Sequence, residues 1–268
     1  MSSRPDGPDP AIRAETAERP ASEYRTIFDA RGGRYNHANR LFPEARAEEG
    51  DRMLAHLSLS EGVRWLDVGA GGGFLAERAA AAGRGGEPVA CDASAVFLSE
   101  ARGYALRTAG DYERLPFSDG AFGAAGCLAV LHHAEAPERV VSEMLRVTAR
   151  GGRVAFGDVA AGSHADRFLN GFVDAHTEQG HAGRFRGAPE AGRLLELGGG
   201  RDVRAESARI FWRFASRVDA RLFFRELFGL REDTEDADLD AAIGWLGLLA
   251  LGEGYGLPWD MVFASAAA

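Results

Sequence analysis

The sequence predicts an α/β fold with a Rossmann-like, doubly wound and mostly parallel sheet. Residues 65–68 form an apolar strand that runs into a glycine turn and an alanine-rich helix over 75–82. A second short strand over 88–92 ends in an acid, and the continuous apolar run over 124–131 suits a central strand buried on both faces. In folds of this kind the ligand lies outside the carboxyl ends of the strands.

The glycine turn after the first strand indicates a ligand. Asp67 stands two residues before Gly69, and three more glycines follow at 71–73. Glycine lets the backbone turn sharply and approach a ligand where any Cβ would collide. A dinucleotide-binding turn, Gly-x-Gly-x-x-Gly, fits poorly because its third glycine would fall on Phe74. The motif alone leaves open a plain strand–helix turn without a ligand.

The spacing Asp-x-Gly-x-Gly-x-Gly resembles the first motif of class I S-adenosylmethionine (SAM)-dependent methyltransferases. The resemblance implies SAM as cofactor and S-adenosylhomocysteine as its product. An acid at the strand end suits this cofactor, since its methionine end carries an ammonium and a sulfonium. The cofactor contacts implied within this motif are Asp67, Gly69, Ala70, Gly71 and Gly73. Many members carry cysteine and serine or threonine where this chain has Ala70 and Gly72. All of these side chains are small, so we expect SAM binding to be kept.

Two acids further along extend the resemblance. Asp92 ends the second strand, at the sequence distance from the glycine turn at which a carboxylate binds ribose hydroxyls in such folds. Ala93, the next residue, is also expected to contact the cofactor. Ser94 is expected to cap the next helix. Asp111 and Tyr112 resemble the family segment that contacts the adenine amino group and ring. Without the resemblance, Asp111 would be an ordinary turn acid.

The fourth strand ends in a pair of histidines. The resemblance places Leu128, in the run 124–131, at the cofactor, and it extends in order through a helix over 137–147 and a strand over 153–156. We expect His133, and after it His132, to be catalytic by taking a proton from the acceptor. The alternative is a histidine that only supports the cofactor, because positioning alone can supply most of the catalysis of methyl transfer. The lesser candidates are His176, His181, Tyr35 and Asp158.

The segment before the core is similar to the N-terminal entry of ubiquinone and menaquinone biosynthesis C-methyltransferases. The shared elements are Phe28-Asp29, Arg34-Tyr35 and Asn39, whereas Asn36 stands where that family has aspartate. In related enzymes such a segment folds over the cofactor, so Tyr35 and Asn36 are expected either to line the SAM pocket or to gate the acceptor. An N-terminal helix that only packs on the sheet is equally open.

The last third of the chain predicts helices over 164–183 and 189–197, and an outer strand over 201–208. An aromatic-rich stretch over 210–228 is either the roof of an acceptor pocket or plain core. The final strand, 257–264, resembles the antiparallel strand at or near the edge of the family's seven-stranded sheet. The fold expected is therefore a seven-stranded sheet with an N-terminal helical lid and a helical insertion before the last strand.

Composition limits the partners and the location. The chain has 268 residues and a formal net charge of -9, which argues against a nucleic-acid substrate. No apolar stretch is long enough for a membrane span, and the two cysteines fall in predicted buried strands, so we expect a cytoplasmic protein without a metal site. A homodimer is left open. The parts expected are a disordered tail (1–22), a helical lid (23–60), a SAM-binding core (61–160) and a C-terminal part with a substrate-pocket insertion (161–268).

These expectations define a SAM-dependent methyltransferase. It would act on an O, N or C atom of a small molecule, such as an aromatic or polyketide-like secondary metabolite. One alternative is a methyltransferase-fold protein that catalyses another reaction, such as cyclisation. Another is a non-catalytic SAM-binding regulatory module.

Overall fold

A twisted sheet forms the centre of the computed structural model, which describes the chain from residue 21, with side chains from residue 25, to residue 268. The expected tail, 1–22, lies almost wholly outside the described residues. Seven strands follow the order β3-β2-β1-β4-β5-β8-β6, and the short β7 pairs with β8. The strands are β1 Arg64–Val68, β2 Glu87–Asp92, β3 Leu106–Ala109, β4 Phe122–Leu128, β5 Thr148–Val159, β6 Arg201–Phe214, β7 Leu249–Ala250 and β8 Tyr255–Ala267.

The pairing of the strands fixes where a ligand can bind. Strands β1 to β5 are parallel to one another, and β8 runs antiparallel to both β5 and β6. The predicted class, a doubly wound and mostly parallel sheet, is therefore confirmed. The chain winds from β1 outward to β3 and then returns to β4, so β1 and β4 form the switch point at whose carboxyl end ligands bind in such sheets.

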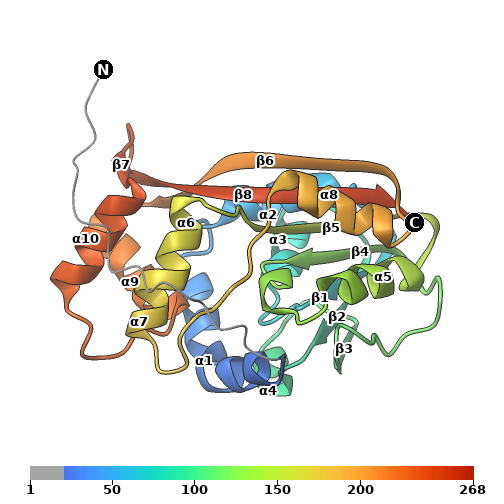
Figure 1. The fold of residues 1–268 in the computed structure, drawn as a ribbon, viewed down its shortest axis with the longest axis horizontal. Helices are drawn as coiled ribbons and strands as arrows, with labels where there is room; N and C mark the ends of the chain where they lie inside the picture. Colours follow the sequence, from blue (N-terminus) through green and yellow to red (C-terminus); the bar gives the residue numbers. More distant parts are fainter. Residues whose placement is uncertain (1–20) are drawn as a thin grey trace.

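Helices cover both faces of the sheet (Figure 1). Helices α5 and α8 pack on one face, and α2 and α3 pack on the other. The helices of this layered core are α2 Ala47–Leu57, α3 Phe74–Ala81, α4 Ala95–Ser99, α5 Pro137–Val147 and α8 Ala188–Leu197. Helix α5 has the predicted bounds because proline opens it and its apolar residues, at helical spacing, are buried against β4 and β5.

The remaining helices, α1 among them, gather beyond one end of the sheet (Figure 1). They are α1 Ala21–Leu41, α6 His164–Arg167, the π-helix η2 Phe168–Val173, α7 Asp174–His176, α9 Arg217–Leu227 and α10 Asp236–Leu246. Helices α9 and α10 lie between β6 and β8 in the chain, which agrees with the expected insertion before the last strand. Arg34 of α1 donates to Glu226 of α9 at 3.0 Å and to the Leu230 carbonyl at 3.0 Å, so the N-terminal helix is bonded to the insertion.

Several element ends differ from the prediction. Strand β4 stops at Leu128 rather than at residue 131, because Ala129 takes a left-handed φ of 57°. The next residues form a 3-10 turn, η1 Leu131–His133. Ser94 caps α4 as expected by accepting from the Phe97 N–H, but α4 ends at Ser99. The helix expected over 164–183 ends at His176, and the outer strand β6 continues to Phe214. Among the described residues, no helix has the length and apolar character that a membrane span requires.

Candidate active site

The glycine loop after β1 lies at the switch point of the sheet. Gly69, Gly71 and Gly73 all have positive φ, between 50° and 100°. A Cβ on Gly69 would come within 2.2 Å of Val130, and the N–H of Gly69 donates to the Cys91 carbonyl at 2.8 Å. The loop therefore depends on glycine both for its backbone angles and for its close approach to β2 and to the turn after β4.

Two buried carboxylates stand behind this loop. Asp92 accepts hydrogen bonds from the backbone N–H groups of Gly71 and Ser94, both at 2.8 Å. Asp67 accepts one from the Tyr104 hydroxyl at 2.6 Å. Burial raises the pKa of Asp67 to about 7 and that of Asp92 to about 6. The loop thus has two acids whose charge a cationic or hydroxyl-bearing ligand would stabilise.

A cavity of about 210 Å³ opens in front of the loop. Its walls include eight of the residues predicted to form the site: Asp67, Gly69, Ala70, Gly71, Leu128, Tyr35, His132 and His133. The other five do not line it: Gly73, Asp92, Ala93, Asp111 and Tyr112. Because ligand pockets usually measure about 300 Å³ or more, this volume is small for a cofactor together with an acceptor.

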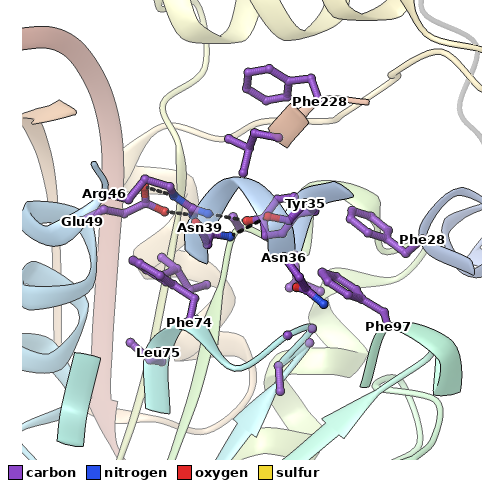
Figure 2. A pocket seen from close by; sticks show the side chains of 18 of the residues that line it. Phe28, Tyr35, Asn36, Asn39, Arg46, Glu49, Phe74, Leu75, Phe97 and Phe228 are labelled. Carbon is purple, nitrogen blue, oxygen red and sulfur yellow. Dashed lines mark hydrogen bonds and ion pairs between the residues drawn. The ribbon is translucent and has the colours of Figure 1, made fainter. Parts of the chain in front are cut away.

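Two stacked phenylalanine rings line the cavity beside the glycine loop. Phe28 of α1 stacks on Phe97 of α4 with ring centroids 5.0 Å apart, and Figure 2 shows the pair beside Asn36. Phe97 lies so close to the loop that a Cβ on Gly71 would come within 2.6 Å of its ring. Ser94 donates to Asp29 of α1 at 2.5 Å, on the same side. Helix α1 therefore covers the part of the loop where Asp92 lies.

Asn36 of α1 lies directly on the glycine loop. A Cβ on Gly72 would come within 1.8 Å of the Asn36 Oδ1 atom. The Asn36 side chain is 3% exposed and lines the cavity, and its Nδ2 atom has no hydrogen-bond partner among the described residues. A buried donor without a partner costs about 1–3 kcal/mol, so this amide is suited to bind a ligand acceptor.

A buried ion pair forms another wall of the cavity, as Figure 2 shows. Arg46 makes a bidentate pair with Glu49 and also donates to the Tyr35 hydroxyl. Glu49 accepts from the Trp212 Nε1 atom at 2.9 Å, and the Arg46 guanidinium lies 4.7 Å from the centre of the Phe74 ring. Sequence reasoning missed this network. Its signal was an acid on the apolar face of α2, four residues before Met53.

The histidines lie in the turn after β4 and not at the strand end itself. His132 is held twice by Asp158 of β5: its backbone N–H donates at 3.0 Å, and its Nδ1 atom lies 2.7 Å from the carboxylate. His133 is adjacent, with ring centroids 3.9 Å apart, and His181 approaches from the segment after α7. Burial, with the charges of His132, His181 and Arg31, lowers the pKa of His133 well below its ordinary value. His133 is therefore neutral at pH 7.

The aromatic stretch that was expected to be either roof or core is both. Phe223 and Phe224 of α9 are fully buried in the hydrophobic core. Trp212 of β6 and Phe228, just after α9, line the cavity. Of the lesser catalytic candidates, His181 and Tyr35 line it as well, whereas His176 does not; its Nδ1 atom lies 2.8 Å from the Phe172 carbonyl.

A known domain family matches the part of the chain that carries the glycine loop. The family model described as "Methyltransferase domain" matches residues 66–156. A demethylmenaquinone methyltransferase of Paenarthrobacter aurescens is 32% identical over 150 residues, covering 54% of this chain and 58% of that protein. A malonyl-(acyl-carrier protein) O-methyltransferase of Erwinia billingiae is 33% identical over 119 residues, covering 42% and 46%. The chain thus spans less than two thirds of the length of either relative.

Solved structures extend the likeness to most of the fold. The cyclase SpnF superposes with a TM-score of 0.63 at 19% identity, over 95% of this chain and 99% of that one. Phosphoethanolamine N-methyltransferase 2 of Haemonchus contortus, solved with S-adenosyl-L-methionine, gives a TM-score of 0.61 at 17% identity, over 91% and 59%. At these identities the likeness shows the fold alone.

Proposed function

The chain belongs to the class I SAM-dependent methyltransferase superfamily, through the domain in residues 66–156, and we propose that it transfers a methyl group from SAM to a small-molecule acceptor. One observation supports this most directly. The glycine loop, which a Cβ at Gly69 would fill, is backed by the buried carboxylates of Asp67 and Asp92 at the ends of neighbouring parallel strands. This donor set fits a ligand that carries both an ammonium and ribose hydroxyls.

We propose the following cofactor contacts. Asp67, with Gly69, Ala70, Gly71 and Gly73, holds the methionine end, and the unpartnered Asn36 Nδ2 atom donates to its carboxylate. Asp92 and Ala93 hold the ribose, Asp111 and Tyr112 hold the adenine, and Tyr35 and Leu128 lie alongside. Because Asp92, Ala93, Asp111 and Tyr112 do not line the cavity, these contacts require the pocket to open, and Phe28 of α1 and Phe97 of α4, which line it beside the loop, are the side chains we expect to move.

The remainder of the cavity supports an apolar acceptor. Its walls away from the loop are mostly apolar, and they include Val159, Leu169, Phe228, Trp259 and Met261. Such walls exclude water and favour an aromatic or polyketide-like molecule over a strongly charged one. SAM, when bound, supplies a methyl group on a sulfonium, so the task of the protein is to hold an acceptor O, N or C atom in line with it.

His132 and His133 are the residues we propose to act on the acceptor. Asp158 accepts from the Nδ1–H of His132, which leaves the Nε2 lone pair available in the cavity. This lone pair can act on an acceptor hydroxyl in one of two ways: it can take the proton itself, or it can hold a cation that acidifies the hydroxyl. His133 adds a second neutral imidazole beside it.

Calorimetric titration with SAM and S-adenosylhomocysteine tests the cofactor. We expect the wild type to bind both and Asp92→Asn to bind at least about tenfold more weakly, since each good charged hydrogen bond is worth about 1.5–3 kcal/mol. Asp119→Asn is the matched control, because Asp119 is an exposed acid whose carboxylate pairs with Arg146 at the surface. Absence of binding to folded wild type would refute the proposal.

Product mass then separates the proposed transfer from its alternatives. Transfer adds one methyl group to the acceptor and converts SAM to S-adenosylhomocysteine. A rearrangement such as cyclisation leaves SAM unconsumed and the mass of the substrate unchanged. A regulatory module would bind SAM and form no product with any acceptor in a screen of aromatic and polyketide-like compounds.

A further inference from the structure

Three imidazoles from two separate segments meet in the cavity. His132 and His133 come from the turn after β4, and His181 comes from the irregular segment between α7 and α8. One ring nitrogen from each lies within 4.8 Å of the other two. We propose that His132, His133 and His181 bind a divalent transition-metal ion such as Zn²⁺, with an open coordination position that faces the cavity.

Two of the three histidines have the tautomer that a metal requires. Asp158 accepts from the Nδ1–H of His132, and Asn170 Oδ1 lies 3.1 Å from the Nδ1 atom of His181. The orientation of the Asn170 amide is fixed, because its Nδ2 donates to Asp166 and to the Gly183 carbonyl while its Oδ1 accepts from the Gly183 N–H. The Nδ1 atoms are therefore donors, and in both rings Nε2 is the nitrogen that carries the lone pair, as a metal ligand requires. Metal-bound histidines are oriented by such partners in known sites.

The spacing of the three nitrogens is close to that of a zinc site. Zn–N bonds of about 2.0–2.1 Å place tetrahedral ligands about 3.3 Å apart. Since the three ring nitrogens lie within 4.8 Å of one another, they must approach each other by at most about 1.5 Å. His181 belongs to no helix or strand, so this movement leaves the sheet in place. Gly183 permits the close approach, because a Cβ there would come within 2.9 Å of both His132 and His181.

The charges around the cluster indicate which ions fit. Asp158 and Asp174 contact the cluster, the latter through the His181 backbone N–H. Arg31 acts electrostatically on His133, and Arg186 on Asp158. The charges of these two carboxylates and two guanidiniums nearly cancel, so the affinity for a metal ion must come from the nitrogen donors. Three imidazoles favour zinc, iron, cobalt or nickel over magnesium and calcium, which prefer oxygen.

An ion at this position would share the cavity with Gly69 and Ala70. Three protein ligands and one open position are the arrangement of catalytic zinc sites, in which a water or a substrate oxygen fills the fourth place. Binding of the ion does not depend on the proposed methyl transfer; only its use to hold an acceptor oxygen rests on that function. With the ion bound, His132 is a ligand and the acidifying group is the ion.

Titration of metal-free protein with Zn²⁺, in the absence of SAM, tests the site. We expect one equivalent to bind the wild type with micromolar or tighter affinity. Removing a ligand in His181→Ala should weaken binding at least about tenfold, and Asp158→Asn should weaken it about 10–100-fold. His37→Ala, which removes an exposed histidine of α1, should bind as the wild type does.

Two further measurements make the result decisive. Circular dichroism confirms that each variant is folded, and X-ray absorption of the zinc-loaded wild type should show three imidazole nitrogens at about 2.0–2.1 Å. Lack of stoichiometric binding by the wild type, or equal binding by His181→Ala, would overturn the inference. SAM titration of the same wild-type sample separates the two proposals: SAM binding without zinc binding refutes only the metal site, and the reverse refutes only the cofactor assignment.

Discussion

Replacing Gly72 with alanine tests how α1 lies on the glycine loop. The new Cβ would stand 1.8, 2.3 and 2.7 Å from the Oδ1, Cγ and Nδ2 atoms of Asn36. Because Asn36 is buried, its amide cannot move away without shifting α1 or the loop. Gly72 does not have a positive φ, so the backbone itself tolerates alanine. Overpacking of this kind costs about 1–3 kcal/mol, and in a protein of this size each kcal/mol lowers the Tm by about 2–4 °C.

A double-mutant cycle isolates this contact. Asn36→Ala alone should be nearly neutral, because it removes packing but also a buried donor that has no partner among the described residues. Combined with Gly72→Ala it should restore wild-type stability, which gives a coupling free energy of about 1–3 kcal/mol. Chemical denaturation measures all four proteins. Gly244→Ala is the control, since a Cβ at this helical position meets nothing within 4 Å and should stabilise by about 0.4–1 kcal/mol. Wild-type stability of Gly72→Ala, or additive effects, would refute the packing.

Three other predictions concern charge and packing. SAM affinity should rise between pH 6 and pH 8, because the pKa of Asp67 is about 7 and the ionised form binds the ammonium; calorimetry at several pH values measures this. Glu49→Gln should lower the free energy of unfolding by about 3–5 kcal/mol in denaturant titrations, because it leaves the Arg46 charge buried without its partner. Phe224→Ala should cost about 3–5 kcal/mol of stability, whereas Phe228→Ala should chiefly raise the acceptor KM in steady-state assays.

The predictions for Asp67 and Glu49 each have a control variant. Asp67→Asn should remove most of the pH dependence, and an affinity independent of pH in the wild type would contradict the role of the carboxylate. Without cofactor the sign reverses: a raised pKa stabilises the fold below about pH 4, and this contribution is lost as the pH rises through 7. Glu44→Gln breaks only an exposed pair with Arg78 and should cost at most about 1 kcal/mol. Equal losses in Glu44→Gln and Glu49→Gln would contradict the buried pair.

Local patterns predicted the core of the fold well. Helix 137–147 is fixed by its opening proline and its apolar spacing, and the glycine loop by backbone angles that other residues avoid. What sequence patterns did not reveal depends on distant contacts. The stack of Phe28 on Phe97 joins residues from α1 and α4 in the wall of the cavity. His181 joins the histidine pair only because the segment after α7 folds back over the turn after β4.

The end of β4 shows the same limit on a smaller scale. The apolar run continues through Leu131, so hydrophobicity alone extends the strand to the histidines. The strand stops at Leu128 because Ala129 turns to positive φ, which no composition rule predicts for alanine. Because the chain turns at this point, His132 lies beside Asp158 of the neighbouring strand β5.

The pairing of β6 with β8 allows the connection between these two strands to be replaced. The two strands are held by a long antiparallel ladder, from Arg204 with Ser265 to Phe214 with Tyr255, and α9 and α10 form the connection between them. Lengthening a connection costs only about 0.6 kcal/mol per doubling, so a segment that also supplies the core contacts of Phe223 and Phe224 can replace this one while the ladder keeps its register. The cavity wall contributed by Leu227 and Phe228 is thus a replaceable module, and grafting a different connection offers a route to new acceptor preferences with the glycine loop unchanged.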